Sequence, residues 1–368
     1  MRAELLSCDD PRWLDFLRGA PHDFYHLPAY VELCARHEGG RPAAFWAAEG
    51  EAAMLIPMVL RPLPPELDPG ARWRDAVAPY GYPCPLLRGD PGDGTVAAML
   101  EAFRGVGAAA GIVSAFLRLH PLLPLPQGPL HAFGDVVAHG ETVYLDLTLS
   151  RAELDRQTRD CHLADVRRLE REGFSVQVDA WGRLDDFIRI YEQTMRYRAA
   201  DAFYFFERGY YDDLRRCLGD HLHLGIVRAP GGEAAAAGLF TRVDGLVQFH
   251  LSGTSEHYRR AGPAKMMLIH MRDWAKAGGA HTLHLGGGVG CRQDSLAFFK
   301  QGFSKLRSRF QTFRMVLKPV IYESLLGRRG LDPGSPCEPA AGYFPAYRCR
   351  GPLIEEEARC QTPVATPS

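Results

Sequence analysis

The sequence lacks the patterns that mark several common classes of protein. It has no run of about 18 uninterrupted apolar residues, and its first residues are charged without an apolar core, so we expect neither a membrane span nor a secretory signal. The nine cysteines form no CxxC pair, which is typical of reduced thiols in a cytoplasm. A formal net charge of −1 gives no overall attraction for polyanions. These absences predict a cytoplasmic protein without integral membrane association.

Motifs of metal and nucleotide chemistry are also missing. The fourteen histidines show no HExxH or similar metal spacing, and there is neither a GxSxG elbow nor a P-loop. We therefore expect no metal and no resident cofactor. Lysine is scarce, because only five of the 43 basic residues are lysines and all five follow residue 260. An arginine bias of this kind is typical of GC-rich bacterial genomes, and it makes each lysine a candidate functional residue.

Length and composition predict two globular domains. The chain has 368 residues, of which 46% are hydrophobic and 24% charged, enough to bury a core in each half. In the first part we expect helices at 11–19, 27–38 and 95–110, strands at 43–48, 52–60, 112–119 and 135–147, and loops at 62–70 and 122–134.

From residue 150 a similar order begins again. We expect helices at 151–172, 181–198, 207–218, 263–277 and 294–301, and strands at 174–178, 221–228, 234–242, 246–253, 281–285 and 305–317. Helices, an antiparallel meander, then a helix and a strand are typical of the acetyltransferase (GNAT) fold. We therefore predict an α/β (α+β) protein with two tandem GNAT-like domains, each a mixed, mostly antiparallel sheet flanked by helices. The predicted domains are 1–149 and 150–320, and an extension at 321–368 wraps the surface.

A glycine-containing loop precedes the helix expected at 263–277. It contains the R-x-x-G-x-A pattern of acetyltransferases that bind acyl-CoA. Glycine lets backbone N–H groups approach a pyrophosphate, and a helix N-terminus favours negative charge. Arg259, Arg260 and Gly262 are therefore candidates for binding the donor. The alternative is an ordinary helix start with a proline in its first turn.

A second glycine cluster follows the strand expected at 281–285. Gly286, Gly287 and Gly288 have no side chains to cover their backbone N–H groups, which could therefore donate hydrogen bonds to a carbonyl or phosphate oxygen. Asp294 and Lys300 follow on a short helix, and Lys300 lies among phenylalanines. A lysine held by apolar neighbours can stabilise the oxyanion that forms when an amine attacks an ester. The alternative is a solvated lysine whose stem covers the aromatic cluster.

Other candidates lie outside these two loops. His250 is close in sequence to the arginine loop and could serve as a base. Dense aromatic segments contain Tyr80 and Tyr204, whose hydroxyls could orient a substrate at a seam between the domains, although aromatic runs usually form core. Arg307 and Arg309 share one face of an expected strand and could follow a nucleic-acid backbone, or simply be solvated.

The expected helix at 151–172 carries Arg167 and Arg168 among acidic residues, so it is neutral overall and could be an ordinary surface helix. The run from Val166 to Gly173 resembles the I-R-K-A-x-K-x-G helix of Fem-type peptidyltransferases. The segments 285–290 and 299–303 resemble the glycine loop and the F-K-x-G-F signature of that family. Together these matches cover about residues 140–320 in the family's order.

The resemblance implies transfer of an aminoacyl group from a charged tRNA onto an amine, such as the stem peptide of a peptidoglycan precursor. By the same analogy, Lys300 would stabilise the transferring carbonyl, and Arg167 or Arg168 would hold a phosphate of the acceptor. The sequence departs from the family in lacking a helical hairpin insertion, and His162 and Asp165 stand where basic residues are common. Relatives of the family include acyl-CoA-type acyltransferases and natural-product amide-forming enzymes, so the resemblance also allows a small natural-product amine as the acceptor.

Three hypotheses follow. The first is an aminoacyltransferase with aminoacyl-tRNA as co-substrate. The second is an acyl-CoA-dependent N-acyltransferase that uses the loop at 259–264. The third is a binding module that keeps the fold without turnover.

Overall fold

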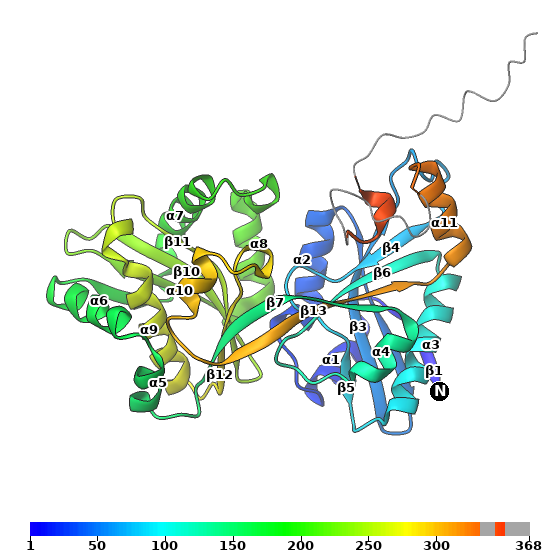
Figure 1. The fold of residues 1–368 in the computed structure, drawn as a ribbon, viewed down its shortest axis with the longest axis horizontal. Helices are drawn as coiled ribbons and strands as arrows, with labels where there is room; N and C mark the ends of the chain where they lie inside the picture. Colours follow the sequence, from blue (N-terminus) through cyan, green and yellow to red (C-terminus); the bar gives the residue numbers. More distant parts are fainter. Residues whose placement is uncertain (332–342, 350–368) are drawn as a thin grey trace, which may run out of the picture.

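The computed structural model describes residues 1–331 and 343–349. The chain forms two lobes that lie side by side and share one continuous sheet (Figure 1). The elements of the first unit are β1 (Arg2–Leu6), α1 (Pro11–Arg18), α2 (Pro28–Glu38), β2 (Arg41–Glu49), β3 (Ala52–Pro62), β4 (Arg74–Val77), β5 (Leu86–Arg88), α3 (Asp93–Ala109), β6 (Ile112–Leu119), α4 (Gln127–Phe133) and β7 (Asp135–Asp146).

The second unit is preceded by α5 (Arg151–Gln157) and α6 (Asp160–Arg171). Its elements are β8 (Ser175–Val178), α7 (Leu184–Tyr197), α8 (Arg208–Leu218), β9 (Leu222–Arg228), β10 (Ala234–Val243), β11 (Leu246–Thr254), α9 (Pro263–Ala277), β12 (Thr282–Gly286), α10 (Ser295–Lys300) and β13 (Arg307–Val316). A further helix, α11 (Pro319–Arg328), follows.

The two units repeat the same order of elements. Leaving aside β5, the order from β1 to β7 in the first unit matches the order from β8 to β13 in the second. In each unit the last strand of the meander pairs in parallel with the strand after the long helix, β4 with β6 and β11 with β12. The predicted fold of two tandem GNAT-like units with mostly antiparallel sheets is confirmed.

The last strand of each unit completes the sheet of the other. The strand order is β1-β2-β3-β4-β6-β13-β7-β12-β11-β10-β9-β8. β13 therefore pairs with β6 of the first unit, although the predicted boundaries assign residues 307–316 to the second domain. In the same way β7 pairs with β12 of the second unit. These two strands cross between the lobes in the middle of Figure 1, so they fix the units against each other.

The contact between the units is an apolar core. One cluster of buried residues runs through the first unit and continues onto α7 and α8 through Phe187, Tyr191, Tyr211 and Leu214. Phe187 and Tyr191 are among the buried residues of α7, the helix that the sequence predicts at 181–198. Burial of these side chains holds α7 and α8 of the second unit against the first.

The helix expected at 151–172 is interrupted. Thr158 has an extended backbone, and its hydroxyl donates to Leu154 O at 3.0 Å and Phe303 O at 3.3 Å. Arg159 N then bonds Gly302 O at 2.8 Å. These contacts to the distant segment 302–303 break the helix into α5 and α6, and no local pattern reveals them.

Several short elements were not predicted. They are β1, β4, β5, α4, which lies in the loop expected at 122–134, and α11. The expected extension at 321–368 begins within α11, where Leu325 and Leu326 join a small core with Val113. Tyr347 Oη lies 2.8 Å from Ser114 Oγ, which ties residues 343–349 to the first unit. The remainder of the expected extension, 332–342 and 350–368, lies outside the described residues. Within the described ranges, no helix is both long and apolar enough to cross a bilayer.

Candidate active site

Lys300 lies where two parallel strands part. The pairing of β11 with β12 ends at Gln248 and His284, and the glycine loop starts two residues later. Lys300 is only 8% exposed and its Nζ donates to Gly287 O at 2.7 Å. The sheet, α10 and the loop thus hold this lysine inside the protein, so it is not a solvated surface lysine.

The glycine loop has no room for side chains. A Cβ on Gly287 would lie 2.9 Å from both Glu141 O and Cys291 Sγ. Gly286 has φ of +74°, and a Cβ there would lie 3.3 Å from Lys300 Nζ and 3.5 Å from the Tyr82 hydroxyl. Gly286 therefore lies closely between an ammonium of the second unit and a phenol of the first, in a backbone conformation that favours glycine.

Asp294 fastens this loop to α10. Its carboxylate accepts from Val289 N at 2.9 Å and from Ala297 N at 2.8 Å, where it caps the helix. Burial opposes its ionisation, but the backbone N–H groups outweigh burial and lower the pKa of Asp294. The charged Asp294 side chain therefore shapes the loop beside Lys300.

Burial also changes the charge on Lys300. Removal of the ammonium from water lowers the pKa of Lys300 to about 8, although Cys291 and Asp294 oppose that shift. The lysine is still mostly protonated at neutral pH. Its charge is poorly screened there, which strengthens its attraction for a developing oxyanion.

A buried polar network lies beside this centre and joins the units. Gln248 Nε2 donates to Asp23 Oδ2 at 2.6 Å, and His284 Nδ1 bonds Gln248 Oε1 at 2.7 Å. His120 Nε2 lies 3.1 Å from the same Asp23 oxygen. Sequence reasoning missed this network, because its residues come from four separate segments and carry no spacing motif.

His250 occupies a bulge in β11. Leu239 and Phe240 of β10 are opposite Leu251 and Phe249, so His250 has no opposite partner. Its Nε2 is buried without a hydrogen-bond partner among the described residues. Burial lowers the pKa of His250 to about 4, so the ring is neutral at neutral pH.

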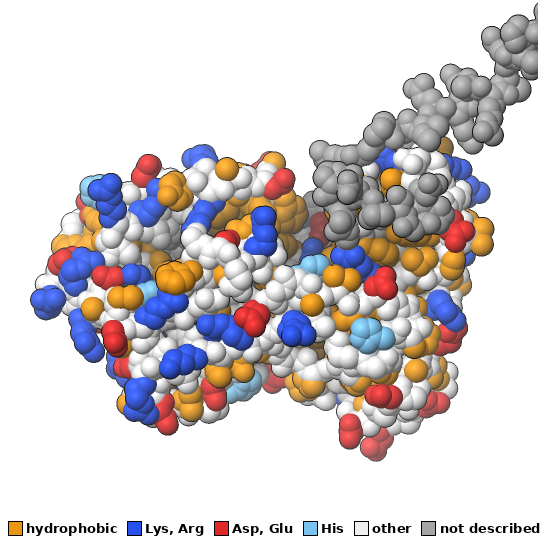
Figure 2. Space-filling view, in the orientation of Figure 1, with side chains coloured by type: hydrophobic (Ala, Val, Ile, Leu, Met, Phe, Trp, Pro, Cys, Tyr) orange, Lys and Arg blue, Asp and Glu red, His pale blue; other side chains and the backbone are white. Residues whose placement is uncertain are grey.

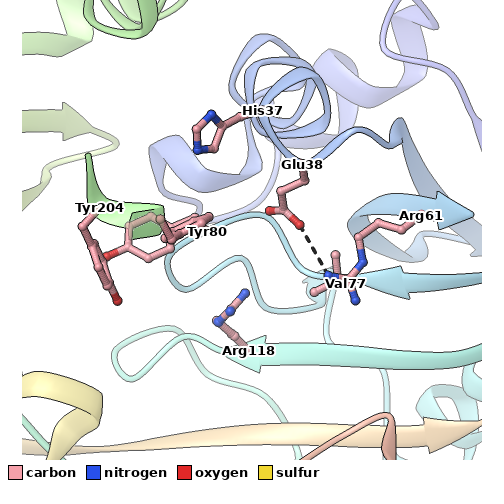
Figure 3. Close-up of a pocket in the computed structure, with 8 residues that line it drawn as sticks. His37, Glu38, Arg61, Val77, Tyr80, Arg118 and Tyr204 are labelled. Atoms are coloured by element: carbon pink, nitrogen blue, oxygen red, sulfur yellow. Dashed lines mark ion pairs between the residues drawn. The ribbon is translucent and has the colours of Figure 1, made fainter. Parts of the chain in front are cut away.

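A cavity of about 420 Å³ lies at the seam between the units. It is lined by His37, Glu38, Arg61, Val77, Tyr80, Arg118, Phe203 and Tyr204, from both units (Figure 3). The rings of Tyr80 and Tyr204 lie 6.3 Å apart, and the Tyr80 ring is also 6.3 Å from the His250 ring. The structure thus brings Tyr80 and Tyr204 together, with His250 next to them.

The charged groups of this cavity differ in how they are paired. Arg61 Nη1 lies 3.9 Å from Glu38 Oε2, the ion pair marked in Figure 3, and Arg61 Nε lies 3.0 Å from Asp75 Oδ1. Burial raises the pKa of Glu38 in spite of the nearby arginines. Arg118 donates to Ala78 O at 2.9 Å and, within residues 1–331 and 343–349, has no carboxylate at ion-pair distance. The cavity therefore contains a cation that is available to an anionic ligand.

The predicted donor residues before α9 lie apart from Lys300 in the sequence and on a different loop. Gly262 has φ of +72° and precedes Pro263, and α9 has no side-chain N-cap. Arg259 stacks on Tyr197, with its Cζ 3.6 Å from the ring centroid, and Arg260 is exposed. The start of α9 thus keeps the features expected of an anion site.

The predicted phosphate-binding arginines of α6 differ from each other. Arg168 donates to Glu172 at 3.1 Å and to Ala261 O at 2.8 Å, so its charge is already paired. Arg167 is exposed. Asp165 forms an ion pair with Lys265, which holds α6 against α9.

Basic side chains cover much of the second unit on the face shown in Figure 2. Arg307 donates to Ser304 O and Leu306 O at 2.9 and 2.8 Å, while Arg309 is exposed opposite Glu141 of β7. Near Lys300, Phe298 is 64% exposed and Arg159 Cζ lies 3.9 Å from its ring centroid. An exposed aromatic ring with an arginine over it is a surface on which a nucleobase can stack.

No three His, Cys, Asp or Glu side chains in the described part of the chain gather as they would around a metal ion.

Comparisons with known proteins agree with this fold. Residues 157–294 match the family model described as an acetyltransferase (GNAT) domain. No curated protein matches the sequence. The solved structure of FemX has a TM-score of 0.68 and 13% identity, covering 88% of this chain and 99% of that chain. L-PGS from Bacillus licheniformis has a TM-score of 0.54 and 15% identity, covering 83% and 92%.

A third similar structure is the C-terminal domain (DUF2156) of a protein described as a lysylphosphatidylglycerol synthetase from Agrobacterium fabrum. It has a TM-score of 0.53 and 15% identity, covering 82% of this chain and 90% of that chain. Residues 157–294 therefore carry an acetyltransferase (GNAT) domain, and the two-unit fold defines the class of GNAT-fold proteins that the sequence predicts. Within that class, the chain has the tandem architecture of FemX, so the predicted Fem-like fold is confirmed.

Proposed function

We propose that this acyltransferase forms an amide bond by moving an aminoacyl group from an aminoacyl-tRNA to an amine. The observation that carries the proposal is the buried ammonium of Lys300, fixed by Gly287 O and close to Gly286 and the Tyr82 hydroxyl of the other unit. Attack of an amine on the ester places negative charge on the carbonyl oxygen. A preorganised cation in a water-poor site stabilises that charge and requires little reorganisation.

The cavity lined by Tyr80, Tyr204 and Arg118 is the proposed acceptor site. Arg118 would bind an anionic group of the acceptor through charge-assisted hydrogen bonds. Tyr80 belongs to the same short segment as Tyr82, whose hydroxyl faces Gly286. The proposal requires an acceptor bound in the cavity to extend past these tyrosines, so that its amine reaches Lys300. A peptidoglycan precursor and a small natural-product amine both meet this description.

The surface beside Lys300 is the proposed site of the tRNA acceptor end. Phe298 lies on α10, two residues before Lys300, and Arg159 lies over its ring. Together they offer a surface on which a base can stack. Arg307 and Arg309 on β13 supply positive charge for the backbone. The name of one structural neighbour, a lysylphosphatidylglycerol synthetase, is in keeping with transfer of an aminoacyl group, and the Fem-type resemblance of the sequence implies an aminoacyl-tRNA donor.

The test is incubation of the purified protein with total charged tRNA and a set of candidate amines, with amide products detected by mass spectrometry. We expect a product whose formation is abolished by prior ribonuclease treatment. A product that survives ribonuclease and requires an added acyl-CoA would refute the tRNA donor.

That second outcome corresponds to an acyl-CoA-dependent N-acyltransferase. The loop at 259–262 and the α9 N-terminus, which has no side-chain cap, favour this alternative because they suit a pyrophosphate. The donor would then bind at the N-terminus of α9, so Arg260→Gln would weaken acyl-CoA binding. Ribonuclease treatment would not change the amount of product formed. Under the aminoacyl-tRNA hypothesis, no resident cofactor or metal takes part, and the reaction is expected in the cytoplasm.

A further inference from the structure

The buried network at the seam determines which nitrogen of His284 carries a proton. Asp23 is fully buried, and its carboxylate accepts from Phe24 N, from Gln248 Nε2 and from the His120 ring. A carboxylate only accepts hydrogen bonds, so the Gln248 group that faces it is the amide nitrogen. The amide oxygen of Gln248 is thereby turned toward His284.

His120 supports the same assignment from the other side. Its Nδ1 faces the backbone N–H groups of Leu122 and Leu123 at 3.0 and 3.2 Å. Nδ1 of His120 is therefore an acceptor, and its proton is on Nε2, which donates to Asp23 at 3.1 Å. The Asp23 side chain thus accepts hydrogen bonds from Phe24 N, from the His120 ring and from Gln248 Nε2.

The oxygen of Gln248 fixes the tautomer of His284. Gln248 Oε1 lies 2.7 Å from His284 Nδ1, and an amide oxygen can only accept, so Nδ1 carries the proton. The other nitrogen, Nε2, then keeps its lone pair. It is buried and has no hydrogen-bond partner in the described chain, and His284 is 0% exposed. A lone pair of this kind is costly to bury without a role.

The His284 ring that bears this lone pair packs against Tyr82, which faces Gly286 and Lys300. The ring of Tyr82 lies 5.3 Å from the ring of His284, and its hydroxyl lies 3.5 Å from the Cβ position of Gly286. Lys300 Nζ lies 3.3 Å from the same position. Burial, together with the charge of Lys300, keeps the pKa of His284 well below its ordinary value, so the ring is neutral and unprotonated at Nε2 near neutral pH.

We propose that His284 Nε2 is the proton acceptor of the acyl transfer, and that Asp23 and Gln248 are positioning residues that keep it in the basic tautomer. This inference rests on the proposed amide formation. As the amine nitrogen bonds to the carbonyl carbon, it loses one proton to Nε2, directly or through one water. As the bond from that carbon to the ribose oxygen breaks, Nε2 returns the proton to the leaving oxygen, so no other reactant is consumed.

The network also explains why both units are needed. Asp23 and His120 belong to the first unit, whereas Gln248 and His284 lie on β11 and β12 of the second. The base therefore forms only when the units are docked. His250, the base expected from the sequence, lies in the bulge of β11 and has no partner that fixes its tautomer.

The decisive variant is His284→Asn. Asparagine can still donate to Gln248 Oε1 from the position of Nδ1, but it offers no base. We expect kcat with charged tRNA and the acceptor amine to fall about 100-fold or more, with a circular dichroism spectrum like that of the wild type. A folded His284→Asn protein with wild-type kcat would overturn the proposal.

The matched control is His223→Asn. His223 is also nearly buried, with Nδ1 3.0 Å from Asp179 Oδ2 and Nε2 without a partner in the described residues, but it lies on β9, three strands from β12. It should retain wild-type kcat. An equal loss in both variants would mean that burial, and not proton transfer, explains the effect, and would also contradict the proposal.

A second measurement does not depend on turnover. ¹⁵N-histidine NMR of the full chain at pH 7 should show a neutral imidazole with its proton on Nδ1. The signals of this ring should be missing from the spectrum of His284→Asn, which assigns them to His284. In Gln248→Met this tautomer should no longer dominate. An Nε2–H tautomer in the wild type would refute the proposal even if amide product forms. Absence of any product from wild-type protein would instead refute the proposed function and leave the tautomer result standing.

Discussion

In each unit two parallel strands separate at the end of their pairing, and the charged side chain at that point differs between the units. In the first unit, β4 and β6 part after Val77 and Phe116, and Arg118 lies there with its charge facing a cavity. In the second unit, β11 and β12 part after Gln248 and His284, and Lys300 lies there next to bare glycines. An arginine keeps its charge at any physiological pH, while a buried lysine can lose it. Under the proposed function, Arg118 of the first unit would bind the acceptor and Lys300 of the second unit would take part in the reaction.

The strongest test of this division is Lys300→Met. Removing a preorganised oxyanion donor reduces kcat by about 10²–10³-fold in comparable sites. We expect a loss of this size, with little change in the KM for the acceptor, because Lys300 belongs to the reacting unit. Lys305→Met is the matched control, since Lys305 is exposed on the segment after α10. Equal activity of both variants would remove Lys300 from the mechanism.

The same variant should change how stability depends on pH. The pKa of Lys300 is about 8 in the folded protein against an ordinary 10.5, so the folded state releases this proton first as pH rises. The free energy of unfolding should therefore increase between pH 8 and 10.5 by up to about 3 kcal/mol from this group alone. Urea unfolding of wild type and Lys300→Met across this window measures the difference. Parallel pH curves would show that the lysine is not buried in solution.

Substitution of Arg118 tests whether the first unit binds the acceptor. Arg118→Met removes the cation from the cavity but keeps the length of the side chain. A lost charge-assisted hydrogen bond costs about 1.5–3 kcal/mol, so the KM of the acceptor should rise about 10–100-fold while kcat changes little. Arg104→Met on the exposed surface of α3 is the control. A fall in kcat without a change in KM would contradict the assignment of the first unit to binding.

The donor side can be tested with two similar aromatic pairs. Phe298 lies under Arg159 near Lys300, and Tyr197 lies under Arg259 near the start of α9. Loss of one stacked base costs about 1–3 kcal/mol, so Phe298→Ala should raise the KM for charged tRNA about tenfold. Tyr197→Ala should leave it unchanged. If Tyr197→Ala instead raised the KM for acyl-CoA and Phe298→Ala had no effect, the donor would bind at the start of α9.

The sequence predicted the parts of the site that are continuous in the chain. The glycine loop, Asp294 and Lys300 fall within 15 residues of one another, and the local pattern of strand, glycines and short helix is enough to group them. The tandem fold followed from a repeated order of elements. Neither inference required knowledge of distant contacts.

The remainder of the site depends on contacts between distant segments. Asp23, His120, Gln248 and His284 meet only because β7 and β13 exchange between the units. Each of these residues alone has an ordinary sequence context. Arg118 and Glu38 of the cavity are likewise separated by most of the first unit. The break at Thr158 also depends on a distant partner, the carbonyl of Phe303.

The most direct measurement is a structure of the protein with a non-hydrolysable 3′-aminoacylamino analogue of the tRNA terminal adenosine. The account predicts that the carbonyl oxygen of this analogue lies about 3 Å from Lys300 Nζ, above Gly286, with the adenine against Phe298. An analogue that binds at the N-terminus of α9, with its carbonyl remote from Lys300, would contradict the account.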